Sequence, residues 1–336
     1  MNPPSTNRPP LVDGFGRVHD RLRVSVTDRC NLRCTYCMPA TGAVFKPRRE
    51  LLTFEEITRV TSVLVNCGVR RVRLTGGEPL VRADLPVLVE QLTSLPGLEN
   101  VGLTTNGLRL EELAEPLRRA GATHLNISLD ALDDDTFEAV TRRTGLDRVL
   151  RGIEVAQRVD FPSIKLNAVS MRGVTESQLL PFGRFARGTG LEVRFIEYMP
   201  LDADRAWQHD RVFAGEEILE QLADAFGPLE PIAASKPAPA TRYRFADGKG
   251  TIGIIPSVSE PFCASCNRFR LTADGRFRAC LFSLEETDVR DRLRRGCDDQ
   301  AIEQAARDCL ASKWAGHHIN LDDFRQPARP MYSIGG

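Results

Sequence analysis

Between residues 20 and 200, short apolar runs alternate with longer segments of helical periodicity. The short runs are rich in Val, Ile, Leu and Thr, which favour β-strands. They predict six strands: LRVSV (22–26), RVRLT (71–75), VGLTT (101–105), LNISLD (125–130), IKLNAV (164–169) and EVRFIEY (192–198). The first intervening helix is predicted to begin after Thr53, which forms a capping-box pattern with Glu56, and to end before Gly68. Strands that alternate with helices indicate a parallel α/β fold.

Periodicity does not distinguish an open doubly wound sheet from a barrel, but in both folds ligands bind at the carboxyl ends of the strands. Chemically distinctive residues follow those ends here. Three cysteines follow the first strand, TGGEP (75–79) follows the second and TNG (105–107) the third. Ser128 and Asp130 close the fourth strand, although Asp130 is also a candidate N-cap for the next helix. We therefore expect these segments to meet in one site.

The repeat fades after residue 200. The Pro- and Ala-rich segment GPLEPIAASKPAPAT (227–241) is typical of an exposed connector. The proline-rich N-terminus is typical of a disordered tail. We therefore divide the chain into a tail (1–12), an α/β domain (13–226), the connector (227–241) and a C-terminal extension (242–336).

Composition restricts the class of protein. The chain has 336 residues, of which 42% are hydrophobic, enough for a large core. Lys plus Arg and Asp plus Glu each number 45, so no overall charge favours nucleic acid or a membrane surface as a partner. No apolar run suits a signal peptide or a membrane span. We therefore expect a cytoplasmic protein with reduced cysteines, and clustered reduced thiols more often bind metal than form disulfides.

Two sets of three cysteines are candidate metal ligands. The first has the spacing C-x3-C-x2-C and the second C-x2-C-x13-C; they are Cys30, Cys34 and Cys37, and Cys263, Cys266 and Cys280. A structural zinc site needs four ligands, and His317 or His318 is a candidate fourth ligand for the second set. An iron–sulfur cluster on three cysteines instead leaves one iron open to a substrate or cofactor. The other cysteines, Cys67, Cys297 and Cys309, fall in helical patterns and are expected to be buried thiols.

The first cysteine motif, with Tyr36 before its third cysteine, resembles the radical S-adenosylmethionine (SAM) superfamily. Further motifs accompany it: TGGEP (75–79), TTNG (104–107), ISLDAL (127–132), KLNAV (165–169), RFIEYMP (194–200), FCASCNRFRLTADG (262–275) and the terminal Gly335-Gly336. In this order they resemble the molybdenum cofactor biosynthesis protein A family, the GTP 3′,8-cyclases. The resemblance runs from about Leu11 to Gly336.

This resemblance implies an incomplete (β/α)6 barrel of the TIM type, with a C-terminal extension that carries a second iron–sulfur site. It implies two [4Fe–4S] clusters, the first on Cys30, Cys34 and Cys37 with SAM on its open iron, the second on Cys263, Cys266 and Cys280 facing GTP. The implied lyase reaction converts GTP to (8S)-3′,8-cyclo-7,8-dihydroguanosine 5′-triphosphate in molybdopterin formation. The resemblance also implies that a 5′-deoxyadenosyl radical takes the hydrogen from C3′ of the ribose.

The resemblance also implies roles for single residues. Those expected to bind SAM are Tyr36, Gly77, Ser128 and Met199; those expected to bind GTP are Arg23, Arg73, Thr104, Lys165, Arg268, Phe269 and Arg270; and Arg17 is expected to be catalytic. Strand alternation allows inward-facing cations in the predicted sheet. Arginine suits a triphosphate because its planar guanidinium binds phosphate through two hydrogen bonds.

As partners, the resemblance implies a second copy in a homodimer, an electron donor such as flavodoxin or ferredoxin, and cyclic pyranopterin monophosphate synthase as the next enzyme. Two other functions stay open from the residues alone. One is a radical SAM enzyme that modifies peptides, which usually carries more C-terminal cysteines than the three found here. The other is a metal-binding regulatory module, which should carry a basic face if it binds nucleic acid.

Overall fold

The computed structural model describes residues 8–233 and 238–336. In this part of the chain the strands form one sheet in the order β12-β11-β10-β1-β2-β3-β4-β5-β6-β9-β8-β7. The six predicted strands are present and pair in parallel in sequence order. They are β1 (Arg21–Ser25), β2 (Arg71–Thr75), β3 (Asn100–Thr105), β4 (His124–Ser128), β5 (Ser163–Ser170) and β6 (Glu192–Glu197).

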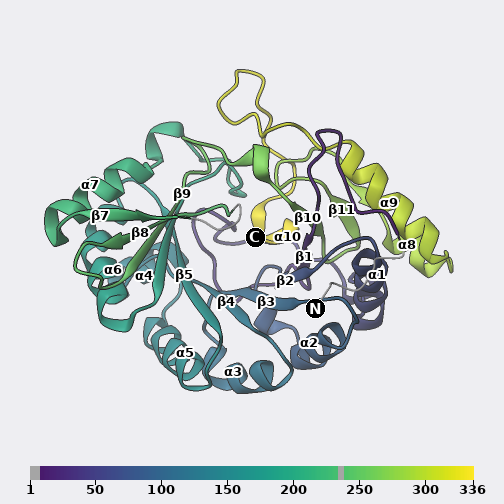
Figure 1. Cartoon of the computed structure of the whole chain (residues 1–336), viewed down its shortest axis with the longest axis horizontal. Helices are drawn as coiled ribbons and strands as arrows, with labels where there is room; N and C mark the ends of the chain where they lie inside the picture. The colour runs from purple at the N-terminus through teal and green to yellow at the C-terminus, as the bar shows by residue number, and fades with distance from the viewer. Residues whose placement is uncertain (1–7, 234–237) are drawn as a thin grey trace.

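The C-terminal part of the chain extends this sheet at both edges. β9 (Thr251–Ile255) pairs in parallel with β6, and β10 (Arg268–Leu271) pairs in parallel with β1. The antiparallel additions are β7 (Leu229–Ile232), β8 (Thr241–Phe245), β11 (Arg276–Arg278) and β12 (Thr287–Asp288). Figure 1 shows the C-terminus and the short helix α10 (Met331–Ile334) at the centre, between the two halves of this curved sheet. The predicted α/β fold with a mostly parallel sheet is confirmed.

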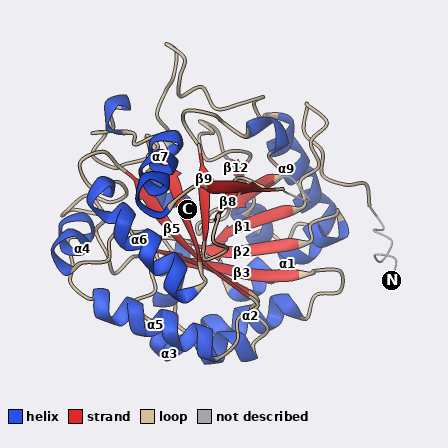
Figure 2. Cartoon of the chain, turned by 60° about the vertical axis from the view of Figure 1, so that its left-hand side comes forward, coloured by secondary structure: helices blue, strands red, loops and turns tan. Residues whose placement is uncertain are grey.

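Helices cover the outer face of the sheet (Figure 2). They are α1 (Phe54–Asn66), α2 (Leu85–Thr93), α3 (Leu110–Arg119), α4 (Asp134–Thr141), α5 (Leu146–Arg158), α6 (Thr175–Thr189), α7 (Gly215–Phe226), α8 (Arg290–Arg294) and α9 (Asp299–Ala311). The predicted capping box opens α1, because the Glu56 N–H donates to Thr53 Oγ1 and the Thr53 N–H to Glu56 Oε2.

Strand alternation separates the core from the interior of the curved sheet. In β2, Val72 and Leu74 are buried in the main apolar core beneath the helices. The intervening Arg71, Arg73 and Thr75 therefore project from the opposite, concave face. Burying an aliphatic side chain of this size stabilises the folded chain by about 1.5–3 kcal/mol. The apolar positions therefore determine which face of each strand packs on the helices, and the polar residues take the other face.

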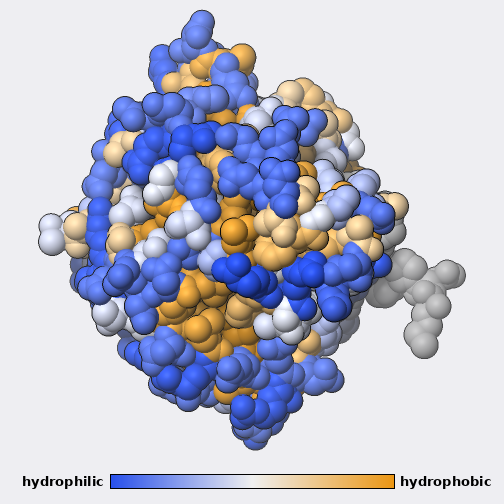
Figure 3. Space-filling model, turned by 90° about the vertical axis from the view of Figure 1, so that its left-hand side faces the viewer, coloured by the Kyte–Doolittle hydropathy of each residue, from blue (hydrophilic) through white to orange (hydrophobic). Residues whose placement is uncertain are grey.

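On the side of the molecule seen in Figure 3, hydrophilic residues surround a central area where hydrophobic residues reach the surface. No helix in the described ranges has both the length and the apolar character needed to cross a membrane.

Two predicted segments differ in the structure. Residues 1–7 of the predicted tail 1–12 and residues 234–237 of the predicted connector lie outside the described residues. The tail prediction needs correction at its C-terminal end, because Leu11 is fully buried and its N–H donates to the Cys67 carbonyl. The connector 227–241 contributes β7, which pairs with β8. In both segments, tertiary contacts override a proline-rich composition.

Candidate active site

The parallel register aligns inward-facing cations from neighbouring strands. Arg270, Arg23 and Arg73 occupy equivalent positions in β10, β1 and β2. Arg73 Nη1 donates to the Leu103 carbonyl at 2.9 Å, and this contact orients its guanidinium. Burial and repulsion from Arg270 hold the pKa of Arg23 well below its usual value. This row of charges is therefore suited to an anion.

A cavity of about 600 Å³, here called the basic cavity, lies at the amino-terminal ends of the first four strands. The cations that line it are Arg21, Arg23, Arg71, Arg73, Lys165, Arg194 and Arg268. Burial and repulsion from Arg194 lower the pKa of Lys165 to about 8. Glu192 offsets part of this charge, since it lies 2.5 Å from Arg194 Nε and 3.8 Å from Lys165 Nζ.

A second cavity of about 270 Å³, the central cavity, shares part of its wall with the basic cavity. Residues that line both include Arg23, Asn126, Arg194, Cys266 and Arg268. The central cavity brings together most of the predicted site residues: Tyr36, Ser128, Met199, Arg23, Thr104, Arg268, Arg270, Cys263, Cys266 and Cys280. Its predicted SAM residues and its predicted second cysteine set therefore face one continuous space.

The first cysteine set lies on the loop after β1, and each of its three residues is partly buried. Backbone hydrogen bonds from Arg33 and Thr35 to the end of α4 hold this loop, and Asn106 Nδ2 lies 3.8 Å from Cys30 Sγ. Burial raises the pKa of Cys30 to about 11 and raises that of Cys34 well above its usual value. Thiolates in this setting need a cationic partner, and a set of three fits a [4Fe–4S] cluster with one open iron.

The second cysteine set follows β9 and flanks β10 and β11. Burial raises the pKa of Cys263, whereas the charges of Arg268 and Lys313 overcome burial at Cys266 and lower its pKa to about 7. His317 Nε2 lies 2.7 Å from the Ser257 carbonyl, and His318 stacks on Trp314. Among the described residues, no group of three or more His, Cys, Asp or Glu side chains is arranged to hold a single metal ion.

The TGGEP loop packs directly on the loop of the first cysteine set. A Cβ on Gly77 would lie 2.4 Å from the Arg29 carbonyl, and the Gly77 N–H donates to the Thr27 carbonyl at 2.8 Å. Gly77 lines neither cavity, so the structure places it between the two loops. Glu78 accepts hydrogen bonds from Thr105 Oγ1 and from the backbone N–H groups of Leu80 and Asn106, and burial raises its pKa to about 7.

Asp130 holds Tyr36 in the wall of the central cavity. Tyr36 Oη donates to Asp130 Oδ2 at 2.6 Å, and the Val169 N–H donates to Asp130 Oδ1 at 2.8 Å. The predicted alternative role of Asp130 as a helix N-cap is wrong, because Asp133 caps α4. Sequence reasoning missed the link to Tyr36, which joins residues far apart in the chain.

The terminal glycines reach the interior of the sheet. Gly336 lines the central cavity. Its carbonyl accepts a hydrogen bond from Thr75 Oγ1 at 2.6 Å, and the Gly335 carbonyl accepts one from Arg270 Nη1 at 2.5 Å. Gly335 has φ +93°, and a Cβ there would lie 2.9 Å from Ser25 Cβ. The close approach and the backbone conformation both require glycine.

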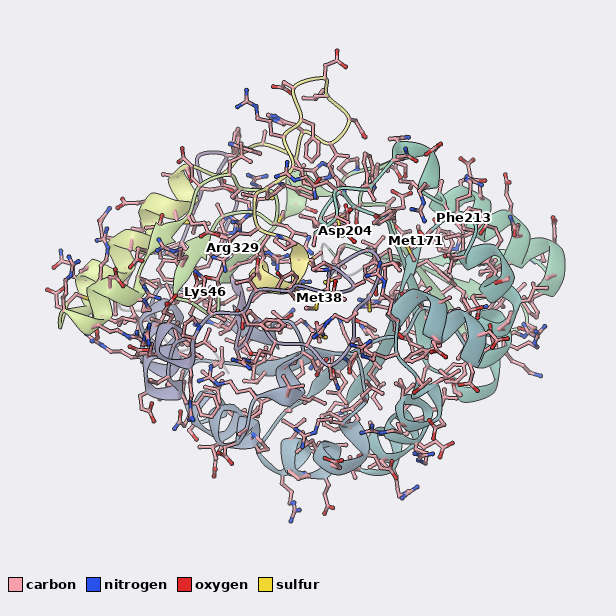
Figure 4. All side chains as sticks on the ribbon, turned by 180° about the vertical axis from the view of Figure 1, so that it is seen from behind. Met38, Lys46, Met171, Asp204, Phe213 and Arg329 are labelled. Carbon is pink, nitrogen blue, oxygen red and sulfur yellow. The ribbon has the colours of Figure 1, made fainter. Side chains whose placement is uncertain are left out.

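Arg329 anchors the segment that precedes these glycines (Figure 4). Its guanidinium lies 2.9 Å from Asp274 Oδ1 and 3.1 Å from Glu286 Oε2. It also donates to the Ser333 carbonyl at 2.7 Å. Arg329 thereby ties α10 to the β10–β11 hairpin.

Like Gly77 and the first cysteine set, the predicted site residues Arg17 and Phe269 line neither cavity. Arg17, predicted to be catalytic, donates to Asp13 Oδ2 and to the carbonyls of Cys263, Trp314 and Ala315. These contacts fix the position of its guanidinium beside the second cysteine set, and its catalytic role stays a prediction. Phe269, predicted to bind GTP, is fully buried with its ring 5.1 Å from that of Phe277. Its side chain packs in the core because alternation in β10 turns Arg268 and Arg270 to the opposite, inward face.

Several lining residues were missed from the sequence. Arg194 and Asn126 line both cavities, and Arg21 and Arg71 line the basic one. Arg21 is paired with Arg71, and Arg194 with Asn167, in the strand register. The signal was present in the alternation of each strand, since these polar residues fall at inward positions between apolar ones.

Comparisons with known proteins identify the family. The chain matches the family models "Radical SAM superfamily" over residues 24–186 and "Molybdenum Cofactor Synthesis C" over residues 191–319. The GTP 3′,8-cyclase of Rhodopirellula baltica is 52% identical over 330 residues, covering 97% of this chain and 92% of that protein. This chain belongs to the GTP 3′,8-cyclase family. Members of this family are radical SAM enzymes with two [4Fe–4S] clusters.

Other GTP 3′,8-cyclases extend the similarity. That of Mycolicibacterium smegmatis is 46% identical (97% of this chain, 92% of that protein), and the mitochondrial one of Arabidopsis thaliana is 40% identical (97% and 83%). Streptococcus suis SuiB bound to S-adenosylmethionine shares the fold with a TM-score of 0.63 at 15% identity, covering 93% of this chain and 76% of that one. Native anSMEcpe with bound AdoMet gives a TM-score of 0.58 at 15% identity, covering 93% of each chain.

Proposed function

We propose that the joined central and basic cavities are the site where this chain converts GTP to (8S)-3′,8-cyclo-7,8-dihydroguanosine 5′-triphosphate for molybdenum cofactor biosynthesis. The observation that carries the proposal is the continuity of the two cavities. The wall of the central cavity carries Cys263, Cys266 and Cys280. The basic cavity carries clustered cations, which repel one another unless an anionic ligand is bound. A nucleoside triphosphate fits this arrangement. Its phosphates neutralise the cations of the basic cavity, and its nucleoside part extends into the central cavity beside the cysteines.

In this proposal, Cys30, Cys34 and Cys37 hold the first [4Fe–4S] cluster. With SAM bound, that cluster supplies the one-electron chemistry that starts the reaction. Tyr36, Ser128 and Met199 line the space for SAM. Their position in the wall of the same cavity supports this assignment. Asp130 fixes the Tyr36 ring, and Gly77 lets the TGGEP backbone approach the cluster loop closely.

The second part of the proposal concerns GTP. Cys263, Cys266 and Cys280 hold the second cluster on the C-terminal extension, beside the guanine. Arg268, Arg270 and Thr104 lie near the ribose and guanine, and Arg23, Arg73, Lys165 and Arg194 bind the triphosphate in the basic cavity. Support comes from the order of these groups along the joined cavities. The protein's contribution is to hold the ribose between the two clusters and to exclude water from the reacting carbons.

The finer architecture and the partners are also part of the proposal. β1 to β6 with their helices form the incomplete (β/α)6 barrel, and the C-terminal extension completes its wall. The chain acts as a homodimer, receives electrons from a flavodoxin or ferredoxin, and passes its product to cyclic pyranopterin monophosphate synthase. Family membership supports these assignments.

The experiment is an anaerobic turnover of reconstituted protein with SAM, a chemical reductant and either GTP or ATP. With GTP, 5′-deoxyadenosine and a cyclic GTP-derived product should form in equal amounts, whereas ATP should give no cyclic product. Cys34→Ala should abolish both products, and Cys67→Ala, at a buried thiol outside both sets, should retain them. Formation of 5′-deoxyadenosine with no loss of GTP would contradict the proposed substrate.

A further inference from the structure

Lys313 is a buried lysine beside the second cysteine set. It follows the C-terminus of α9 and is 5% exposed. Its Nζ lies 3.6 Å from Cys266 Sγ and donates to the Arg268 carbonyl at 2.8 Å. Lys313 lines neither the central nor the basic cavity. Binding of GTP or SAM therefore does not account for its position.

A buried ammonium group needs an anionic partner, because desolvation disfavours its charged form. Throughout residues 8–233 and 238–336, no Asp or Glu carboxylate lies within 4.0 Å of Lys313 Nζ. The group near Lys313 Nζ that can carry a negative charge is the sulfur of Cys266. Of the three cysteines in the set, Cys266 is the one with a lysine Nζ at its sulfur. The ammonium group is therefore directed at one proposed ligand of the second cluster.

We propose that Lys313 sets the reduction potential of the second cluster through its positive charge and its N–H···S hydrogen bond to Cys266. This inference rests on the proposed function, in which Cys263, Cys266 and Cys280 hold that cluster. A cluster gains one negative charge when it accepts one electron. A cation held 3.6 Å from a ligand sulfur therefore stabilises the reduced form more than the oxidised form, and raises the potential.

The test is a redox titration of the reconstituted full-length protein, followed by electron paramagnetic resonance. Lys313→Met removes the charge and keeps the apolar stem, Lys313→Gln keeps an N–H donor without charge, and Lys313→Arg keeps the charge. Lys249→Met, on the exposed turn between β8 and β9, is the matched control. The signals of the two clusters are assigned with Cys34→Ala and Cys280→Ala.

At the wild-type midpoint, Lys313→Met should lower the ratio of reduced to oxidised second cluster at least tenfold, which is about 59 mV for one electron. Lys313→Gln should shift the potential in the same direction by less. Lys313→Arg and Lys249→Met should match the wild type, and the first cluster should keep its potential in every variant. If Lys313→Met does not fold, Lys313→Gln carries the comparison.

The two possible failures are distinguishable by iron content. About eight irons per chain with an unchanged potential in both Lys313→Met and Lys313→Gln would overturn this inference alone. About four irons in the wild type, with none lost in Cys280→Ala, would overturn the proposed second site and this inference with it. An equal shift of both cluster potentials would also contradict the inference, because it would indicate a general structural effect.

Discussion

Thr75, at the end of β2, donates a hydrogen bond of 2.6 Å to the carbonyl of Gly336, the last residue of the sequence. The hydrogen bond joins the first residue of the TGGEP motif to the terminal glycine. The same glycine lines the central cavity. Two motifs that lie far apart in the chain are thus parts of one local structure, and the position of the C-terminus becomes testable.

Arg329 should control access to this terminus. Its charge-assisted hydrogen bonds to Asp274 and Glu286, each about 1.5–3 kcal/mol, hold the segment before α10 in place. Arg329→Gln should therefore increase the rate at which a carboxypeptidase releases the terminal residues at least tenfold. Arg325→Gln, at an exposed position in the same segment, should leave that rate unchanged. Equal rates in the two variants would show that Arg329 does not anchor the tail.

Gly77 should be intolerant of any side chain. In Gly77→Ala the new Cβ would meet the carbonyls of Arg29 and Asp28 at 2.4 and 2.7 Å, which backbone atoms can relieve only by moving the cluster loop. We expect a loss of stability of about 1–3 kcal/mol and a loss of the iron held by the first set. Gly188→Ala, in α6 with no atom within 4 Å of its Cβ, should instead be neutral or stabilising by up to about 1 kcal/mol.

Thermal denaturation and iron content measure both effects of Gly77→Ala. A variant with wild-type stability and a full complement of iron would show that the two loops separate more easily than their contact indicates.

Arg73 should contribute to GTP affinity rather than to stability. Burial, with repulsion from Arg194, lowers its pKa to about 10, so the free protein gains little from this charge. Removing it in Arg73→Ala should weaken GTP binding by about 1.5–3 kcal/mol, or roughly 10- to 150-fold. Isothermal titration with GTP should show this loss, and SAM affinity should stay the same. Arg119→Ala, on the exposed surface of α3, is the control and should bind GTP normally.

His19 should make folding sensitive to acid. Burial and the nearby charge of Lys313 lower its pKa from 6.5 to about 4. Between these values the unfolded chain binds a proton that the folded chain excludes, so the free energy of unfolding should fall as the pH falls from 6.5 to 4. His124, with its pKa also lowered to about 4 chiefly by burial, acts in the same direction.

Urea denaturation at pH 7 and pH 5 tests this dependence. His19→Gln, which keeps a donor for Asp13, should lose less stability between the two pH values than the wild type. The same loss in both proteins would mean that His19 is protonated as easily in the folded chain as in the unfolded one.

The sequence predicted the six parallel strands because each apolar run is short, alternating and bounded by turn residues. It also predicted which loops meet, since the carboxyl ends of parallel strands lie at one edge. The pairing of Arg23 in β1 with Arg270 in β10 carried no local signal, because the two strands lie far apart in the chain. Extension of the sheet at both edges therefore appeared only in the structure.

For individual site residues too, strand alternation predicted some features, whereas contacts between distant segments could not be predicted. Arg23, Arg73 and Lys165 were predicted as cavity residues and do line the basic cavity, since strand alternation fixes their direction. Alternation turns the Phe269 side chain away from that face, and its contact with GTP stays a prediction. The four partners of Arg17 could not be predicted, because they depend on the folded loops around Cys263, which the sequence pattern does not place.

The central claim is that the joined cavities hold GTP with its ribose beside the SAM site. The most direct test is anaerobic turnover with GTP that carries deuterium at C3′, followed by mass spectrometry of the products. The account predicts one deuterium in 5′-deoxyadenosine and a cyclic product that has lost it. Unlabelled 5′-deoxyadenosine formed together with GTP consumption would contradict the predicted placement of the ribose.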